Sequence, residues 1–432
     1  MTDVRINHNL RLSVPAVSAR ISVDVVASTL ARLIGSHLAV TRADLVRVTG
    51  LARSTVTTGL DLLEHAGLIG NLGVQATIGR GRPAEKLGLS PSFGLILVAD
   101  LGARFARFSV HDLGQQMLAY TDSWLDITDG PESVLNIVVE TFETLISQIE
   151  HQRPVPLVVV IGLPGPVDVE RGTAVKPPLM PGWDGYPVAD TLQAKLGCPV
   201  LCDNDVNLRA LGEARAVAAD QSPLLYVKVS TGIGGGLVIS TGELYHGADG
   251  SAADIGHVRV HGADDVLCMC GNYGCIEALA SAPAILRQLS QLDCPDVVLP
   301  TTQDELTAAL KANEKVTVGT VREAASRIGE VVADLVHFYN PARIVVGGGL
   351  TVPSDDILAG IRAVVYQRAL PLATRNLVIC HPALDEWSGT AGGLVLGIEH
   401  VLTPDVLSAS LARATATRRS GADNYKVALA AR

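Results

Sequence analysis

The stretch Asp254-Ile-Gly-His257, followed by Cys268-Met-Cys-Gly-Asn-Tyr-Gly-Cys-Ile-Glu277, is the most informative part of this chain. Its three cysteines, Cys268, Cys270 and Cys275, fall within eight residues, and His257 precedes the first of them by eleven positions. One imidazole and three thiolates make a complete tetrahedral ligand set for Zn²⁺, with no position left for water. Buried cysteines that only fill a core have no reason to gather in this pattern with glycines between them. The pattern therefore predicts a zinc site that is structural, not catalytic.

The same stretch resembles the signature of the ROK family of sugar kinases and sugar-responsive repressors, E-x-G-H followed by C-x-C-G-x-x-G-C-x-E. The chain matches every position except the first, where Asp254 stands for Glu. The resemblance covers about residues 23–403 and implies a two-lobed α/β body of the actin-like ATPase (ribonuclease H-like) type. It also implies that Asp254, His257 and Glu277 lie at a sugar-binding site, so that zinc fixes the loop beside the sugar.

Length and composition favour a cytoplasmic protein of two or three domains. The chain has 432 residues, of which 48% are hydrophobic. No uncharged apolar run reaches the roughly 18 residues of a membrane span, and the N-terminus has no continuous apolar block of a secretory leader. Seven cysteines, three of them assigned to zinc, fit a reducing compartment better than a disulfide framework. We therefore expect no membrane partner.

The net charge of −10 hides an asymmetry between two parts of the chain. Residues 1–90 contain ten Lys and Arg against six Asp and Glu, a balance of +4, so the remainder has 24 against 38, a balance of −14. A basic small module joined to an acidic large one indicates that only the small module contacts a polyanion.

Residues 23–90 show the pattern of a winged helix-turn-helix. Apolar positions predict a helix from Val23 and a short second helix after Thr41, whose hydroxyl can cap it. The preceding residues, 1–22, have no clear period, and we expect them to form a mobile arm.

The third helix of this module, over 52–67, has the features of a recognition helix. Its inner face is apolar, while its outer face begins with an arginine and short hydroxyl side chains: Arg53, Ser54, Thr55 and Thr57. Such side chains reach base edges and phosphates without filling the groove. These four residues are therefore candidate DNA contacts.

The stretch 68–89 predicts a β-hairpin wing that carries Arg80-Gly-Arg82-Pro. Gly and Pro keep the backbone thin while the guanidinium groups of Arg80 and Arg82 project, a form suited to a narrow minor groove. A protein-interaction or dimerisation domain is the alternative for a three-helix module of this size. The order of recognition helix and basic wing favours DNA, and repressors of the ROK family carry such a module ahead of the body.

The body begins with Asp100-Leu-Gly102-Ala103-Arg104, which resembles the first phosphate turn of actin-like ATPases, D-x-G-G-T. The resemblance makes Asp100 and Gly102 candidate phosphate-binding residues. However, Ala103 adds a Cβ where the backbone should approach a phosphate, and Arg104 replaces the Thr hydroxyl. We therefore expect ATP and Mg²⁺ to be cofactors only if kinase activity survives these changes.

Acids and amides cluster at 203–207, after a predicted strand, where ligands of α/β sheets usually lie. One such residue can cap the helix that follows, but a cap does not need four. In kinases of the ROK family the Asn-Asp pair binds the sugar and the Asp is the general base, which assigns these roles to Asn204 and Asp205. A carboxylate suits this task because it accepts the hydroxyl proton during phosphoryl transfer.

Two further glycine turns and a helix complete the body, which we place at 91–403. Thr231-Gly232-Ile-Gly234 is an intact second phosphate turn, whose backbone N–H groups can cradle an anion. A third glycine stretch, 347–349, matches the one that lies against adenosine in the family. The last predicted helix should pack back on the first lobe, and the tail 404–432 is expected to be mobile.

Together these features predict a sugar-responsive transcriptional regulator. Its winged helix would bind double-stranded operator DNA as part of a homodimer or homotetramer, and its body would sense a sugar or sugar phosphate. The alternative is an active ATP-dependent sugar kinase of the hexokinase type with an appended DNA-binding domain, which Asp205 and the intact glycine turns support. A zinc-stabilised scaffold without a ligand fits least, because it leaves Asn204, Asp205 and Glu277 without a role.

Overall fold

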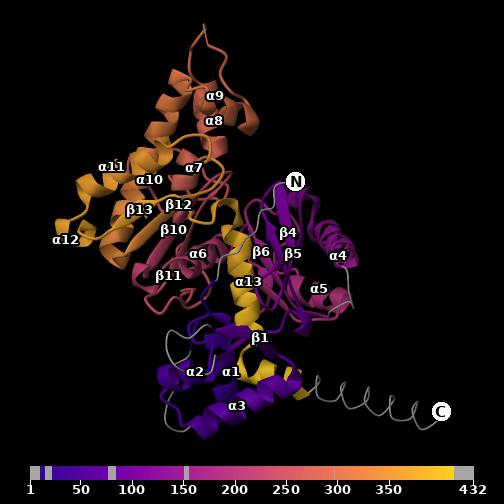
Figure 1. The fold of residues 1–432 in the computed structure, drawn as a ribbon. Helices are drawn as coiled ribbons and strands as arrows, with labels where there is room; N and C mark the ends of the chain where they lie inside the picture. The colour runs from indigo at the N-terminus through magenta and orange to yellow at the C-terminus, as the bar shows by residue number, and fades with distance from the viewer. Residues whose placement is uncertain (1–9, 15–21, 76–83, 150–154, 296, 413–432) are drawn as a thin grey trace.

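The protein consists of a winged helix and two α/β lobes (Figure 1). The computed structural model describes residues 10–14, 22–75, 84–149, 155–295 and 297–412. In the view of Figure 1 the winged helix, in indigo, lies under the seam between the lobes. This is the predicted architecture, a winged helix-turn-helix joined to a two-lobed actin-like body.

Three short helices and a β-hairpin form the winged helix: α1 (Val23–Gly35), α2 (Arg42–Thr49), α3 (Arg53–Ala66), β1 (Ile69–Gln75) and β2 (Ala84–Leu89). The Thr41 hydroxyl accepts a hydrogen bond from the Asp44 N–H, which is the predicted cap of α2. Gly50 and Gly67 end α2 and α3 in the left-handed conformation that glycine adopts without strain. Strand β1 pairs antiparallel with β2, as predicted for the wing.

The first lobe is built on a five-stranded sheet in the order β5-β4-β3-β6-β9. Its elements are β3 (Leu95–Leu101), β4 (Phe105–Asp112), β5 (Met117–Trp124), α4 (Pro131–Ser147), β6 (Pro156–Leu163), α5 (Val188–Leu196) and β9 (Val200–Asn204). Strand β3 is apolar except for Asp100, because both its faces are buried. Leu95 and Leu97 pack in the core with α4, whereas Ile96 and Val98 pack in the core shared with the winged helix. A short ribbon, β7 (Val167–Asp168) with β8 (Thr173–Ala174), follows β6.

The second lobe is built on a four-stranded sheet in the order β11-β10-β12-β13. Its elements are β10 (Leu224–Val229), β11 (Ile233–Val238), α7 (Ile276–Ala280), α8 (Ala282–Ser290), α9 (Gln303–Lys311), α10 (Lys315–Tyr339), β12 (Arg343–Gly347), α11 (Asp356–Arg368), α12 (Pro371–Thr374) and β13 (Val378–Cys380). Val227 and Val229 of β10 pack in the core with α10 and α11, while Tyr226 faces the opposite side. Helices α8 and α9 project at the far end of this lobe (Figure 1).

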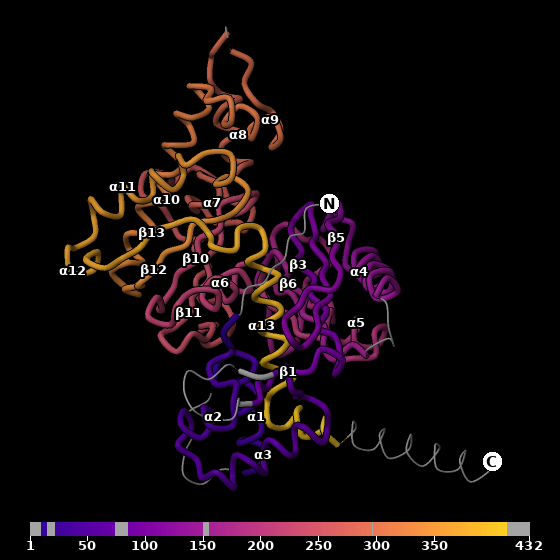
Figure 2. Tube along the Cα trace, in the orientation of Figure 1, coloured from indigo at the N-terminus to yellow at the C-terminus, as the bar shows by residue number. Residues whose placement is uncertain are grey.

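Two helices pack against each other between the lobes, α6 (Asp205–Ala216) and α13 (Ser388–Val401). A Cβ on Gly392 of α13 would lie 1.8 Å from the carbonyl oxygen of Leu208 in α6. A Cβ on Gly212 of α6 would lie 2.1 Å from the carbonyl oxygen of Ser388. Only glycine fits at such a close crossing. Figure 2 shows α13 continuing from the seam down to the winged helix.

Residues 10–14, which we call the arm, differ from the mobile segment predicted for 1–22. Leu10 and Leu12 are 1% and 3% exposed and belong to the apolar core that also contains α1 and α13. The Leu12 N–H donates to Ser36 Oγ at 2.8 Å. The sequence did not reveal this packing because five residues are too few to show a period. Residues 1–9 and 15–21 lie outside the described residues.

Residues 404–412 likewise differ from the mobile tail predicted for 404–432. They form a helix, Pro404–Ala412, whose Leu407 and Leu411 are buried in the core of the winged helix. Residues 413–432 lie outside the described part of the chain. Among the described residues no single helix is long and apolar enough to cross a membrane. In the part of the chain that the structure describes, one bent pair passes on length and composition, Asp385–Val401 and Pro404–Ala412, with an angle of 68°.

Candidate functional site

A cleft lies between the two lobes and contains about 950 Å³ of empty space, part of it open to solvent. Polar side chains from both lobes line it, among them Asn204, Asp205, Asn207, Lys228, Thr231, Asp254, His257 and Glu277. All five predicted sugar-binding residues thus converge on one cavity. The loop 164–166 lines it as well.

Asn204 caps α6 and joins it to the wall of the cleft. Its Oδ1 accepts hydrogen bonds from the N–H groups of Val206 at 2.9 Å and Asn207 at 3.3 Å. Its Nδ2 donates to the carbonyl oxygen of Gly165 at 2.8 Å. Asn204 is therefore the cap that the sequence allowed for, and the other polar residues of the cluster make different contacts.

Asp203 connects the cap of α6 to a second loop. Its Oδ1 accepts a hydrogen bond from Asn207 Nδ2 at 2.8 Å, and its Oδ2 lies 2.8 Å from His246 Nε2. The hydrogen bond with Asp203 raises the pKa of His246. Sequence reasoning did not single out His246, because a lone histidine after a hairpin carries no specific signal.

Asp205 is 2% exposed and forms an ion pair with Lys228 through its Oδ2 atom. Because Lys228 belongs to β10, the pair joins α6 to the sheet of the second lobe. A carboxylate oxygen that already accepts from an ammonium has fewer lone pairs left for a substrate hydroxyl. Lys228 was not predicted as a site residue. Its one signal was a single charge in the otherwise uncharged strand Leu224–Val229.

Glu277 of α7 lies against the second glycine turn. Its Oε2 accepts a hydrogen bond from the N–H of Ile233 at 3.0 Å, and a Cβ on Gly232 would lie 2.8 Å from the same oxygen. Burial raises the pKa of Glu277, and the hydrogen bond opposes that shift. Thr231, Gly232 and Gly234, predicted to hold phosphate, all line the cavity. The Ile233 N–H, one of the backbone donors of this turn, is thus already bound to the Glu277 carboxylate.

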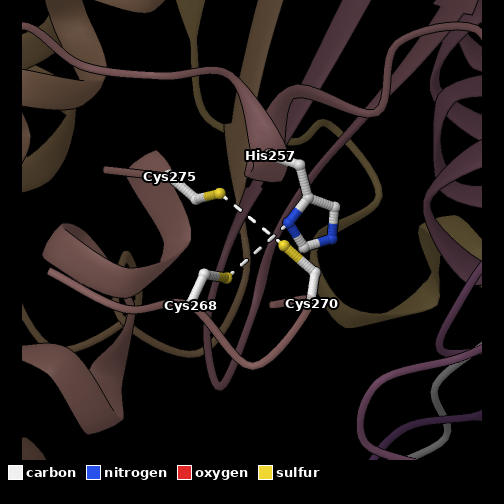
Figure 3. A group of neighbouring side chains, drawn as sticks. All are labelled: His257, Cys268, Cys270 and Cys275. Carbon is white, nitrogen blue, oxygen red and sulfur yellow. Dashed lines mark hydrogen bonds between the residues drawn. The ribbon is translucent and has the colours of Figure 1, made fainter. Parts of the chain in front are cut away.

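The four predicted zinc ligands form one cluster beside the cleft (Figure 3). Their ligand atoms all lie within 4.8 Å of one another. Cys268 Sγ is 3.8 Å from His257 Nδ1, and Cys270 Sγ is 3.7 Å from Cys275 Sγ. Tetrahedral Zn²⁺ with Zn–S bonds of ~2.3 Å separates its sulfur ligands by roughly 3.8 Å, so these residues fit the ion.

The cluster holds together two segments that line the cleft. His257 lies in a 3-10 turn (Ile255–His257), three residues after Asp254. Cys275 is the residue that precedes α7, two positions before Glu277. An ion bound here would therefore fix the backbone on both sides of the two carboxylates.

Asp100, in contrast, does not line the cleft. It is 4% exposed and forms an ion pair of 2.7 Å with Arg209 of α6. Although burial acts against it, the Asp100 charge raises the pKa of Arg209, as expected for a buried pair. A Cβ on Gly389 would lie 2.2 Å from Asp100 Oδ2, so the start of α13 covers this carboxylate.

The rest of the first phosphate turn is bound within its own hairpin. The Gly102 N–H donates to the carbonyl oxygen of Phe105 at 2.7 Å. Arg104 is largely exposed and lies 3.9 Å from Asp126. Ala103 is the residue of this turn that lines the cavity. The turn thus offers the cleft a methyl group where an ATPase presents backbone donors.

The candidate DNA contacts lie at the start of α3 on its outer face. Arg53, Ser54 and Thr57 are exposed, and Thr55 is half-buried. Val56, on the inner face, is buried. The wing residues Arg80 and Arg82 lie outside the described residues.

The fold and the cleft define a winged-helix protein with a sugar-kinase-like body. Residues 97–399 match the ROK family model. The xylose repressor of Caldicellulosiruptor bescii is 27% identical over 374 residues, which span 84% of this chain and 93% of the relative. The chain belongs to the ROK family, and the resemblance predicted from the zinc stretch is confirmed.

Two solved structures resemble this fold to different extents. A ROK family transcriptional regulator, a homologue of the Escherichia coli Mlc protein, has a TM-score of 0.74 at 24% identity and covers 90% of this chain and 98% of its own. A ROK family glucokinase from Streptomyces griseus, solved with glucose and AMPPNP, has a TM-score of 0.61 at 26% identity and covers 70% and 99%. A match over 90% of the chain cannot be confined to the body, so the regulator shares the N-terminal domain as well.

Proposed function

We propose that the protein is a DNA-binding transcriptional regulator that responds to a sugar bound in the cleft. Binding to operator DNA requires a cytoplasmic location, and a symmetric operator requires a homodimer or homotetramer. The exposed outer face of α3 supports the DNA contact through Arg53, Ser54 and Thr57. Arg80 and Arg82 of the wing would add contacts to the minor groove.

One observation carries this proposal: the sugar side of the cleft is open, whereas the first phosphate turn is not. Asn204, Asp205 and Glu277 line the cavity. Asp100 is covered and paired with Arg209, and Ala103 occupies the surface that a phosphate should approach. These residues do not fit Mg-ATP, so the body would bind a sugar without phosphorylating it efficiently.

The groups that line the cleft are suited to sugar hydroxyls. Asn204 has one amide N–H not used by the helix cap or by Gly165. Asp254 offers a carboxylate, and Glu277 has one carboxylate oxygen not used by the glycine turn. Zinc would be held by His257 Nδ1 and the three thiolates, and it would supply a rigid structural crosslink at this wall of the cleft.

An active sugar kinase is the second candidate function. It is favoured by Asp205, which occupies the position of the general base, and by the second glycine turn, which lines the same cavity. The two functions differ in one measurable quantity, the rate of phosphoryl transfer.

The experiment compares DNA binding and turnover in the same preparation. Full-length protein is titrated against a duplex selected from a random pool, with and without xylose or glucose, and a coupled assay with Mg-ATP measures turnover on both sugars. We expect a sugar-dependent change in DNA affinity and turnover far below the roughly 1 to 100 per second of kinases. The double variant Ala103→Gly/Arg104→Thr should stay slow because Asp100 still pairs with Arg209. Turnover in the ordinary kinase range by the wild type would favour the enzyme instead.

A further inference from the structure

Helix α6 reaches from the cleft to the winged helix. Its cap Asn204 and its first-turn residues Asp205 and Asn207 line the cavity, and Arg215 lies in its last turn. Its 12 residues span about 18 Å at a rise of 1.5 Å each. A helix of this length that is packed along α13 moves as one rigid element, so a shift at one end displaces the other.

The last turn of α6 is hydrogen bonded to the arm, residues 10–14. The Arg11 N–H donates to the carbonyl oxygen of Arg215 at 3.1 Å, and Arg11 Nη2 donates to that of Ala214 at 2.8 Å. In return, Arg215 Nη1 donates to the carbonyl oxygen of Arg11 at 3.2 Å. Backbone and side-chain hydrogen bonds of Arg11 and Arg215 thus join the arm to the end of α6.

The arm in turn contacts the DNA-binding domain. Arg32 of α1 donates from Nη1 to the carbonyl oxygen of Ser13 at 2.9 Å. Gln115 Nε2 donates to the carbonyl oxygens of Leu10 and Gly35, both at 3.0 Å, and so joins the arm to the end of α1. Leu10 packs in the core of the winged helix. The arm is therefore a strap between α6 and α1.

Glu399, near the end of α13, closes the connection. Its carboxylate lies 2.9 Å from Arg215 Nη1 and also accepts from the Ser13 N–H. Arg32 Nη2 donates to its carbonyl oxygen at 2.8 Å. Elements from the body, the arm and the DNA-binding domain thus meet at one residue, Glu399.

Buried charges of both signs meet at this junction. The guanidinium groups of Arg32 and Arg215 lie against Glu399. Glu243 acts on Arg32 as well, and Asp220 acts on Arg11. Burial lowers the pKa of Arg11 and of Arg32, and the nearby Arg215 charge lowers both further. Buried charges are stable only where their partners are well placed, so a displacement of α6 changes the stability of the whole junction.

We propose that α6 transmits sugar binding from the cleft to the DNA-binding domain and that Arg215 is the positioning residue that couples α6 to the arm. This inference rests on the proposed function. A sugar that engages Asn204 and Asp205 shifts the start of α6, and Arg215 carries the shift through the arm to α1. Because coupling between two binding sites is reciprocal, operator DNA must change sugar affinity by the same factor.

The test is Arg215→Met in the full-length chain, which retains the apolar stem and removes the donors. Affinity for the selected duplex is measured with and without xylose or glucose, and sugar binding is followed by calorimetry with and without the duplex. Allosteric coupling is typically about 5-fold to 150-fold. We expect the factor by which sugar changes DNA affinity to fall below about 3-fold in Arg215→Met. The variant should still bind sugar in the absence of DNA. Arg327→Met, which removes an exposed ion pair with Glu323 on α10, is the matched control and should keep the full factor.

Each outcome is decisive. If Arg215→Met responds to sugar as strongly as the wild type, the coupling inference is wrong and the proposed function stands. If the wild type binds DNA equally with and without a sugar that it binds, the proposed function fails and the inference falls with it. Where Arg215→Met does not fold, Glu399→Gln removes the charge from the same junction and keeps an acceptor. A full response in folded Glu399→Gln contradicts the inference, and a reduced response with unchanged sugar binding supports it.

Discussion

The sugar side and the phosphate side of the cleft use similar polar residues in opposite ways. On the sugar side, Asn204, Asp205 and Glu277 face an open cavity. On the phosphate side, Asp100 is covered, and its Oδ2 is paired with Arg209. Under the proposed function, this difference lets a kinase-like body keep ligand recognition and lose transfer, because the two tasks depend on separate sets of groups.

Helix α6 contributes to both sides. Asp205 opens the helix at the cleft, and Arg209, four positions later, lies one turn along and binds Asp100. The same helix ends at Arg215, which contacts the arm. Substitutions that alter the sugar side or the phosphate side alone can test whether the two sides act separately.

The largest expected effect comes from the zinc cluster, which lies beside Asp254 and Glu277 and away from Asp100. Cys270→Ser should lose the metal and, with it, the stabilisation by sugar, because the segments that carry Asp254 and Glu277 are released. Structural zinc contributes on the order of 10 kcal/mol in small domains, so a large fall in unfolding temperature is expected. Metal analysis and thermal unfolding with and without sugar are the measurements.

Cys294→Ser is the control for this change, because Cys294 is partly buried and lies outside the cluster. It should retain one zinc per chain and an unchanged response to sugar. Purified wild-type protein with less than one zinc per chain would contradict the assignment.

A smaller effect is expected from the Asp205–Lys228 pair. Asp205→Ala should abolish sugar binding and destabilise the fold by at most about 3 kcal/mol, because it leaves the partly buried Lys228 ammonium without its partner. The double variant Asp205→Ala/Lys228→Met should recover most of that stability but not sugar binding. Denaturant unfolding and calorimetry separate the two quantities.

If Asp205→Ala bound sugar normally and lost only turnover, the residue would be a catalytic base and not part of the recognition site. That result would remove the contrast between the two sides of the cleft.

The smallest expected effect is the pH dependence of the unfolding free energy that the His246–Asp203 pair causes. The hydrogen bond to Asp203 raises the pKa of His246, so its stabilising contribution is complete below the unfolded value near ~6.5 and is lost as pH rises through the folded pKa. The unfolding free energy of the wild type should fall by less than about 1 kcal/mol over this range, since the pair is partly exposed. His246→Gln should flatten that part of the curve.

His111 in the first lobe provides the opposite case within the same experiment. Burial lowers the pKa of His111 to about 3, so its contribution is present above ~6.5 and is lost as pH falls. If the unfolding free energy of His246→Gln fell as steeply above pH ~6.5 as that of the wild type, a group other than His246 would cause the fall.

Much of the site was accessible from local sequence. The four predicted zinc ligands, Cys268, Cys270 and Cys275 with His257, lie within 19 residues, and their spacing predicted the single cluster that they form. Helix α3 was predicted from its period, because Val56 and Leu60 face inward while Arg53 faces outward. Such local patterns need no knowledge of distant contacts.

Other parts of the protein were decided by contacts between distant segments. Residues 1–22 were predicted to be mobile, yet Leu10 and Leu12 are buried because α1 and α13 supply an apolar surface for them. The pairing of Lys228 with Asp205 depends on the approach of β10 to α6, which no local pattern records.

The sequence alone determined which chemical groups are present: the zinc ligands, the carboxylates of the sugar side, and the loss of glycine and threonine at Ala103 and Arg104. Only the tertiary structure decided which of these groups are free to meet a ligand. Asp100 and Asp205 are alike in the sequence as acids at the ends of strands, and each is paired with a cation. One is covered by α13 while the other lines the cleft. The physical reason is that the availability of a charge depends on burial and on its partner, and both are set by packing between segments far apart in the chain.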